Sequence, residues 1–322
     1  MLKQLAVVAF ATLATTSGVI AQAYPTKPIT FVVPFAAGGP NDVLARIVAD
    51  HMSRTLGQPI IVENAAGAGG TTGSARAAKA DPDGYTLLSG NLGSLAAGFA
   101  LYQKIRYDPR DFVSVGMLAG TPNFLVVHKD FPAKTLAEFI ANAKANPDTI
   151  TMGNAGLGSN GHLVCLYLES LAGVKIRHVP YRGSGPAMND LMGGKIDGMC
   201  DSTPTVVPQV LAGTIRALVV AQPSRIAAVD VPSATEAGLP NFNVVGWNAV
   251  MAPPKTPKAI IIKVNAALTA ALKDPGVRKR IEDIGAIPPK AEEASPDWMD
   301  SFLRAEVDAW GKVVRAAGVS ID

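Results

Sequence analysis

Two glycine-rich turns in this sequence have the residue types that bind small anions. The first, Pro34–Asp42, follows the apolar run Ile29–Val33, and the second, Asn154–His162, follows the run Ile150–Gly153. Each leads from a predicted strand into the start of a predicted helix. The first N–H groups of a helix have no partners within it, the helix dipole favours negative charge there, and glycine lets the backbone approach a ligand closely. Each turn therefore predicts a site for a small anion.

Polar side chains at these helix starts suggest more specific roles. Asp42 falls near the third helical position, where a carboxylate can accept free N–H groups and pair with Arg46 four residues on; capping the helix and orienting the loop are compatible roles. The hydroxyl of Ser159 is free to reach an anion. His162 lies one turn further, and either faces the ligand or packs beneath the loop. Asp201 follows a short predicted strand and should lie at the same sheet edge.

The sequence contains only incomplete versions of enzyme motifs. Gly156-x-Gly158-x-x-Gly161 has the spacing of a dinucleotide fingerprint, but the next strand leads into Pro180-Tyr181-Arg182 without the acidic residue that would hold a ribose. Ser159 lacks the G-x-S-x-G context of a hydrolase nucleophile. The cluster Gly67–Gly73 lacks the Lys and Ser/Thr of a phosphate-binding P-loop; it predicts a tight loop into the next helix, with direct ligand contact as the weaker alternative. We therefore expect no enzyme and no cofactor, with an exported hydrolase as a weaker alternative.

The cysteine and histidine content argues against a metal site. The four histidines are scattered along the chain and the two cysteines lack the short spacings of metal ligands. Cys165 and Cys200 are either disulfide-bonded, as pairs in oxidising compartments often are, or two buried thiols; sequence alone leaves both open. The histidines are His51, His128, His162 and His178.

Residues 1–23 have the three-part layout of a secretory signal. Lys3 precedes the apolar stretch Leu5–Thr15, and small residues lead to Ala21-Gln22-Ala23 directly before Tyr24. A membrane anchor would need about 20 apolar residues, and Thr, Ser and Gln residues interrupt this run. We expect export across the inner membrane with cleavage after Ala23.

Composition excludes one large class of partner. The net charge of the 322 residues is only +3 and no basic cluster stands out, whereas nucleic-acid-binding domains concentrate Lys and Arg. Aromatic residues make up 6% of the chain, too few for a base-stacking platform. We expect a small-molecule ligand and no nucleic acid.

Short β-rich runs alternate with amphipathic helices along the chain, which indicates an α/β fold of mostly parallel sheets with helices on both faces. The two matching turns, about 120 residues apart, suit two lobes that present loops across a cleft. Helices are expected to begin at Thr135, which has Glu138 three residues on, and after Thr256 and Ser295. Trp247 interrupts an apolar run and is interpreted as a core residue. The last helix is predicted to bury Trp298, Phe302, Trp310, Val313 and Ala317.

A series of ordered motifs extends from Tyr24 to about Gly318. In this order they resemble the Bug-type periplasmic receptors of tripartite tricarboxylate transporters. The motifs are Tyr24-Pro25-x-Lys27-Pro28-Ile29, Pro34-Phe35-x-x-Gly38-Gly39-x-x-Asp42, Val62-Glu63-Asn64-x-x-Gly67, Pro82-Asp83-Gly84-Tyr85-Thr86, Gly156-x-Gly158-Ser159-x-x-His162-Leu163, His178-Val179-Pro180-Tyr181-Arg182-Gly183, Asp190-Leu191-x-Gly193-Gly194-x-x-Asp197 and Val231-Pro232-Ser233-x-x-Glu236-Ala237-Gly238.

The resemblance implies a type II periplasmic-binding-protein fold. Its two Rossmann-like lobes, residues 24–123 plus 247–322 and residues 124–246, would be joined by two crossover segments around the ligand cleft. It also implies a monomeric periplasmic protein that grips a small carboxylate and delivers it to integral membrane subunits; a sensor subunit with a membrane partner would share these features. The ligand-binding residues carried over are Pro34, Phe35, Ala36, Gly38, Gly39, Asn41, Asp42, Gly90, Asn91, Ala155, Gly156, Gly158, Ser159, His162, Tyr181 and Asp201.

The chain departs from the family pattern at three places. Cys165 replaces the usual residue on the second helix, and Cys200 replaces an aromatic residue before Asp201. The loop after Gly90 reads Asn91-Leu92-Gly93-Ser94, where the family commonly has Asn-Pro. These departures leave the identity of the carboxylate open, and the paired cysteine changes favour a Cys165–Cys200 bridge.

Overall fold

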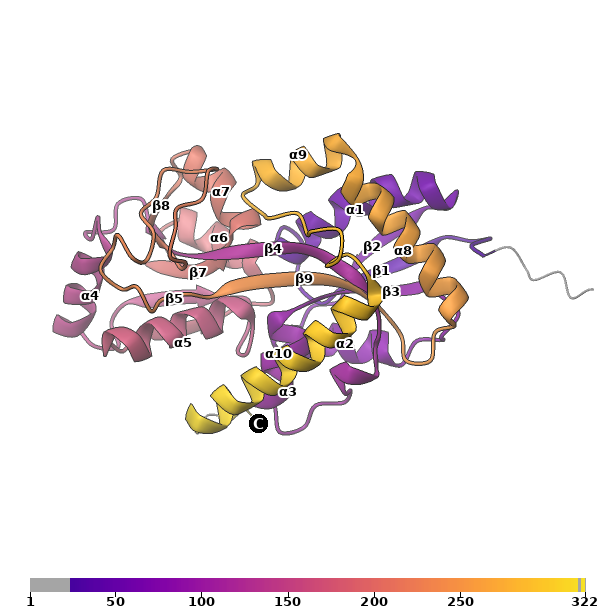
Figure 1. The fold of residues 1–322 in the computed structure, drawn as a ribbon. Coiled ribbons are helices and arrows are strands. Elements are labelled where there is room, and N and C mark those ends of the chain that lie inside the picture. The colour runs from indigo at the N-terminus through magenta and orange to yellow at the C-terminus, as the bar shows by residue number, and fades with distance from the viewer. Residues whose placement is uncertain (1–23, 318–319, 322) are drawn as a thin grey trace, which may run out of the picture.

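Two long strands run through the middle of the molecule and connect its two halves (Figure 1). They are β4 (Val113–His128) and β9 (Val245–Ala252), which pair antiparallel. The computed structural model describes residues 24–317, 320 and 321, so the predicted signal segment lies outside the described residues. Among the helices of that part of the chain, none has the length and apolar character that a membrane crossing requires.

The first half contains a sheet in which β1 (Ile29–Val33) lies between β2 (Ile60–Asn64) and β3 (Thr86–Asn91), all parallel. Successive residues of a strand point to opposite faces. Phe31 therefore packs in the apolar layer beneath α1 and α8, whereas Val32 packs beneath α10. The helices of this half are α1 (Pro40–Leu56), α2 (Thr71–Ala78), α3 (Gly98–Leu101), α8 (Lys258–Lys273), α9 (Pro275–Asp283) and α10 (Pro296–Ala317).

The second half repeats this arrangement. β5 (Thr151–Asn154) lies between β6 (Arg177–Pro180) and β7 (Gly198–Ser202), all parallel, and the end of β4 pairs antiparallel with both β7 and β8 (Ile215–Val220). Parallel pairs thus form the centre of each half, and β4, β8 and β9 run antiparallel to their partners. The helices are α4 (Leu136–Ala145), α5 (Asn160–Ala172), α6 (Ser184–Met192) and α7 (Thr203–Leu211).

Strand β4 is unusually long. It spans the apolar runs Val113–Leu118 and Phe124–His128 and the polar segment between them without a break. Pro122, which cannot donate to a ladder, pairs with Val245 at the first residue of β9, where the ladder ends and the missing amide has little effect. The predicted lobe boundaries therefore fall inside β4 and near the start of β9, and they stay a prediction.

The helix starts agree with the sequence at all three sites. Thr135 accepts a hydrogen bond from the amide of Glu138, and Ser295 accepts one from the amide of Trp298. Helix α8 begins at Lys258 directly after Thr256-Pro257, where the Thr256 hydroxyl donates to the carbonyl of Pro253 in the preceding turn.

The predicted buried face of the last helix was partly wrong. Val313 is 55% exposed, and Trp298 and Phe302 are only partly buried. The face that packs into the core is turned one residue along the helix, because this helix crosses from one half to the other and meets apolar side chains of both. Its buried residues are Met299, Leu303, Val307 and Val314.

Candidate functional site

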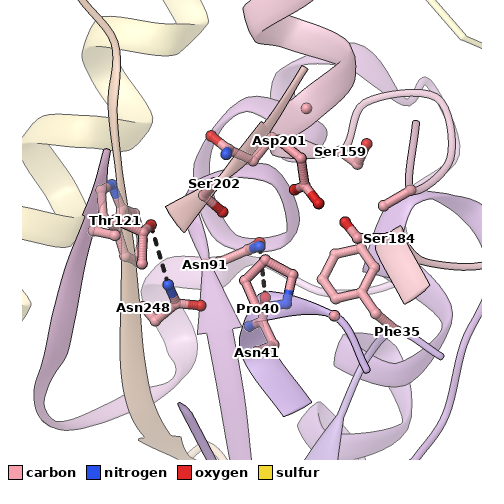
Figure 2. Close-up of a pocket in the computed structure, with 15 residues that line it drawn as sticks. Phe35, Pro40, Asn41, Asn91, Thr121, Ser159, Ser184, Asp201, Ser202 and Asn248 are labelled. Carbon is pink, nitrogen blue, oxygen red and sulfur yellow. Dashed lines mark hydrogen bonds between the residues drawn. The ribbon is translucent and has the colours of Figure 1, made fainter. Parts of the chain in front are cut away.

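The N-termini of α1 and α5 meet at one cavity between the two halves (Figure 2). The two glycine-rich turns predicted from the sequence are thereby brought together from opposite halves. The cavity is narrow, since the centre of a water-sized sphere can occupy about 20 Å³ of it. Its lining residues are Phe35, Gly39, Pro40, Asn41, Asn91, Thr121, Ala155, Ser159, Asn160, Gly161, Ser184, Asp201, Ser202, Trp247 and Asn248.

Asp42 holds the first turn in shape without lining the cavity. Its carboxylate accepts hydrogen bonds from the amide of Gly38 (3.0 Å), from the guanidinium of Arg46 (2.9 Å) and from Nδ2 of Asn64 (2.9 Å). Burial raises the pKa of Asp42, but the bonds from Arg46, Gly38 and Asn64 outweigh burial and leave the pKa below its ordinary value. The carboxylate thus stays ionised and aligns the turn, which fits the capping role weighed from the sequence.

Two asparagines continue the wall of the first half. Asn41 donates through Nδ2 to the carbonyl of Ser89 (2.9 Å) and accepts through Oδ1 from Nδ2 of Asn91 (2.9 Å). The Oδ1 of Asn91 in turn accepts from the amide of Ser94 (2.9 Å). Because this series of hydrogen bonds ends on a main-chain group at each side, the Ser89 carbonyl and the Ser94 amide, the two side chains form a rigid support for the start of α1.

Ser159 and His162 play different roles in the second turn. Ser159 caps α5: its hydroxyl oxygen accepts from the amide of His162 (3.4 Å), and the residue lines the cavity. His162 packs beneath the turn, where its Nδ1 accepts from the amide of Gly158 (3.1 Å) and its ring meets that of His178 edge-on. Burial, and secondly the neighbouring His178, lower the pKa of His162 to about 4. This ring is therefore a neutral support for the turn.

Asp201 points its carboxylate into the cavity, between Ser184, Phe35 and Asn91 (Figure 2). It is only 3% exposed and accepts a hydrogen bond of 2.5 Å from the hydroxyl of Thr205. Burial raises the pKa of Asp201 to about 6, although bonds from Thr205, Ser202 and Ser184 act in the opposite direction. An acidic side chain with a raised pKa thus forms one wall.

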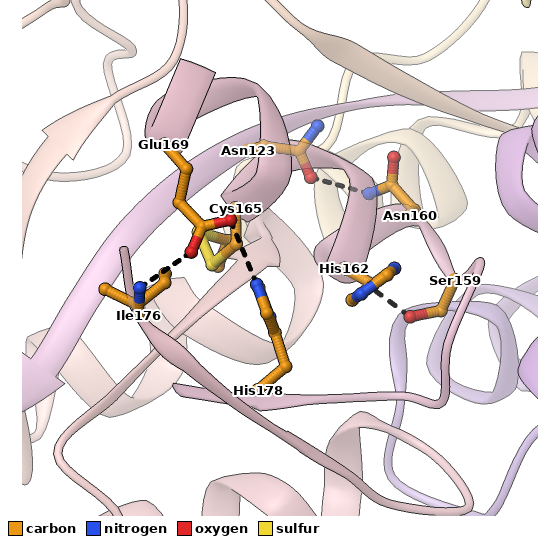
Figure 3. Close-up of a disulfide and its surroundings, with 9 residues drawn as sticks. Asn123, Ser159, Asn160, His162, Cys165, Glu169, Ile176 and His178 are labelled. Atoms are coloured by element: carbon orange, nitrogen blue, oxygen red, sulfur yellow. Dashed lines mark hydrogen bonds and ion pairs between the residues drawn. A yellow bond between two sulfur atoms is a disulfide. The ribbon is translucent and has the colours of Figure 1, made fainter. Parts of the chain in front are cut away.

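A disulfide joins Cys165 on α5 to Cys200 on β7, which answers the question that the sequence left open (Figure 3). Helix α5 lies directly on this strand, since a Cβ added at Gly161 would come within 2.3 Å of the carbonyl oxygen of Cys200. The next residue after Cys200 is Asp201. The bond therefore ties the helix that begins at the cavity to the strand that carries the acidic wall.

The two halves also touch each other at the rim of the cavity. The amide of Ala36 donates to the carbonyl of Arg182 (3.0 Å), and the hydroxyl of Tyr102 donates to the carbonyl of Leu157 (2.8 Å). A Cβ added at Gly185 would lie 2.2 Å from the carbonyl oxygen of Ala37, so α6 packs here only because its residue is glycine. The structure therefore has its halves closed upon each other.

Of the predicted ligand-binding residues, seven line the cavity and nine do not. Those outside it have structural contacts: the Tyr181 hydroxyl donates to Asp190 (2.9 Å), and Gly90 packs against Leu95. The residues that line it are Phe35, Gly39, Asn41, Asn91, Ala155, Ser159 and Asp201; those that do not are Pro34, Ala36, Gly38, Asp42, Gly90, Gly156, Gly158, His162 and Tyr181.

Sequence reasoning missed several lining residues. Thr121, Trp247 and Asn248 lie on β4 and β9, whose polar residues gave no signal because long-range strand pairing brings them to the cavity. Trp247 was interpreted as core; it packs in the core, donates through its indole N–H to Glu306 (2.7 Å) and also lines the cavity. Ser184 begins α6, a helix start that the glycine criterion passed over. Ser202 was also missed, whereas Pro40, Asn160 and Gly161 lie within the two predicted turns but were not named individually.

Comparison with known proteins places this architecture in a family. Residues 44–319 match the family described as "Tripartite tricarboxylate transporter family receptor". The chain belongs to this receptor family. The Bug-type resemblance inferred from the motifs is thereby confirmed.

Three solved structures are similar to this receptor over nearly its full length. MatC from Rhodopseudomonas palustris, solved with bound malate, is 42% identical with a TM-score of 0.87, covering 90% of this chain and 100% of MatC. The periplasmic binding protein BugD is 37% identical (TM-score 0.89; 92% and 99% covered). A second R. palustris protein, solved with adipate, is 35% identical (TM-score 0.87; 92% and 99% covered). These similarities confirm the α/β periplasmic-binding-protein fold, and the relatives are binding proteins rather than enzymes.

Proposed function

We propose that this receptor is exported, binds a small carboxylate in the cavity between its halves and delivers it to integral membrane subunits of a tripartite tricarboxylate-type transporter. The observation that carries the proposal is the meeting of two helix N-termini, those of α1 and α5, at one enclosed space. Unpaired N–H groups and two helix dipoles then act on the same anion, from opposite halves. Malate and adipate in relatives of known structure support a carboxylate as that anion.

Closure of the halves follows from this arrangement. A ligand that accepts hydrogen bonds from both turns has more contacts in the closed state than in the open state, so it shifts the equilibrium toward closure. Exclusion of water strengthens these charge-assisted bonds. We also propose that the signal segment is cleaved after Ala23, that the mature receptor is a monomer, and that it delivers its ligand to the membrane subunits.

The hydrolase alternative receives no support from the site. The ring of His162 accepts from the Gly158 amide, and among the described residues no hydrogen bond joins that ring to the Ser159 hydroxyl. Asp201 instead has Thr205 as its partner. The residues that a Ser–His–Asp mechanism would need are therefore each engaged in structural bonds, and we propose that the receptor performs no chemistry.

Calorimetry on the freshly purified mature protein tests the proposed function. Mono-, di- and tricarboxylates should be titrated beside neutral sugars, and native mass spectrometry should search for an acid that copurifies. Saturable binding of one or more carboxylates is expected. Binding of none of them, or copurification of a neutral ligand only, would contradict it. Co-purification with solubilised membrane subunits distinguishes transport from signalling to a membrane sensor.

A further inference from the structure

The charge inside the cavity is unusual for a site that receives an anion. Of the lining residues in the described part of the chain, Asp201 alone has an ionisable side chain, and that side chain is acidic. The groups around it are the hydroxyls of Thr205 and Ser184 and the main chain of Ser202. The part of the cavity wall around Asp201 therefore offers a hydrogen-bond acceptor and no positive charge.

A second acceptor beside it is fixed by a chain of amides. The Nδ2 of Asn123 donates to the carbonyl of Val244 (2.9 Å), so the Oδ1 of Asn123 must accept from the Nδ2 of Asn160 (2.6 Å). This leaves the Oδ1 of Asn160 as a buried oxygen without a partner in the described structure. Because a main-chain carbonyl determines the orientation, the free atom of Asn160 is an acceptor and not a donor.

Asn248 provides a third acceptor on the same cavity. It is 2% exposed, its Nδ2 donates weakly to the hydroxyl of Thr121 (3.4 Å), and its Oδ1 has no partner among the described residues. Buried oxygens without donors are rare in folded proteins, because each loses its bond to water without replacement. Two such oxygens and one carboxylate on a single cavity indicate that a ligand supplies the donors.

We propose that Asp201, Asn160 and Asn248 form an acceptor site for a hydrogen-bond-donating substituent of the ligand, so that the receptor selects hydroxy- or amino-substituted carboxylates over unsubstituted ones. This rests on the proposed function, since the carboxylate itself is bound by the helix starts. Asn160 belongs to both parts of the site: it is the first residue of α5 and carries one of the free acceptors. The donor therefore sits close to the carboxylate, as on the adjacent carbon.

The negative charge of Asp201 also disfavours an unsubstituted dicarboxylate whose second carboxylate faces it. Two like charges in an enclosed space repel strongly, and no basic residue lines this cavity in the described chain. A hydroxyl donates to Asp201 without adding charge, and an ammonium group adds an opposite charge.

Sets of acids that differ only at the adjacent carbon test this directly. Calorimetry should compare succinate, malate and aspartate, and likewise propionate, lactate and alanine, and glutarate, 2-hydroxyglutarate and glutamate. The hydroxy or amino acid of at least one set is expected to bind at least about tenfold more tightly than its unsubstituted partner, because a site built to accept from a substituent discriminates against its absence. The pH dependence separates the two donors. As Asp201 ionises, its charge repels the ligand carboxylate, which lowers the affinity for a hydroxy acid, whereas an ammonium group offsets this repulsion, so the affinity for an amino acid rises.

Two variants assign the discrimination to this wall. Asp201→Asn keeps an oxygen for Thr205 but removes the charge, and Asn248→Ala removes one acceptor. In both variants the preference for the substituted over the unsubstituted acid should fall to within about threefold, while the unsubstituted acid keeps or gains affinity. Equal binding of substituted and unsubstituted acids by the natural receptor would overturn the acceptor site and leave the proposed function standing. If no acid of any set binds while another carboxylate does, the acceptor site fails and the proposed function stands; if no carboxylate binds at all, both fail. An equal loss for every acid in both variants would also overturn the acceptor site.

Discussion

The backbone amide of Ala36 donates a hydrogen bond to the carbonyl oxygen of Arg182, with nitrogen and oxygen 3.0 Å apart, and so links the two halves. Ala36 belongs to the first glycine-rich turn, and Arg182 lies two residues before the start of α6. Neither side chain takes part, so this link depends only on how closely the two backbones approach. The two backbones can approach this closely only because residues 183 and 185 are glycines without a Cβ atom.

Gly185→Ala is therefore expected to hinder closure. The new Cβ would lie 2.2 Å from the carbonyl oxygen of Ala37, a distance that forces the halves apart. Ligand affinity should fall at least about tenfold. Because each half keeps its own packing, the free energy of unfolding should change by less than about 1 kcal/mol. Gly311→Ala on α10, where the new Cβ meets only the flexible end of Arg315, is the matched control. Calorimetry and small-angle scattering measure both effects; unchanged affinity would contradict the closure argument.

Ser159→Ala should weaken both stability and binding. The cap of α5 is lost, which costs about 1 kcal/mol, and a hydroxyl that lines the cavity disappears with it. Thr135→Ala removes an equivalent cap from α4, away from the cavity, and should reproduce the stability loss alone. Chemical denaturation and calorimetry on both variants separate the two effects. Equal affinities in the two variants would show that Ser159 acts only as a cap.

Replacing both cysteines with alanine should destabilise the receptor. The bond closes a loop of sequence separation 35, and such a loop contributes about 3–4 kcal/mol through the unfolded state. Both residues are buried, so alanine adds no polar atom to the core. Urea unfolding of the natural and Cys165→Ala/Cys200→Ala proteins, with and without reductant, checks this: reductant should affect only the natural protein.

Stability should depend on pH through Asp201. Its folded pKa is raised from 3.8 to about 6, so between these values the folded state binds more protons than the unfolded state. The contribution of this group is fully present below about pH 4 and is lost as pH rises through about 6, a difference of about 3 kcal/mol. Thr205, Ser184 and Ser202 surround the carboxyl and are uncharged at these pH values. The stability of the natural protein relative to Asp201→Asn should therefore fall between pH 4 and 6.5; a pH-independent difference would contradict the buried, raised pKa.

Much of the fold could be predicted from local sequence. Strand β1 and the glycine-rich turn after it were found because apolar runs and glycines mark them without reference to distant residues. The cap at Thr135 was found for the same reason. The exposed position of Val313 was not, because which face of α10 is buried depends on the two halves that this helix crosses.

The site was predicted only where it is local. Ser159 and Asn41 lie in the turns that the glycine pattern marked, and both line the cavity. Asn248 and Thr121 reach it through pairing between β9 and β4, a contact between residues 127 positions apart that no local pattern encodes. Asp42 and His162 have residue types that suggest ligand contact, but their hydrogen bonds are directed into the turns themselves.

The disulfide has a further consequence for how the receptor becomes functional. It connects α5, which begins after Ser159, to β7, which carries Asp201. The disulfide thereby helps to fix the distance between the helix start that binds the anion and the Asp201 side chain. Thiols stay reduced in the cytosol and oxidise outside it. If the chain is exported as we propose, this disulfide forms only after the chain has left the cytosol, and export is then a maturation step as well as a route of delivery.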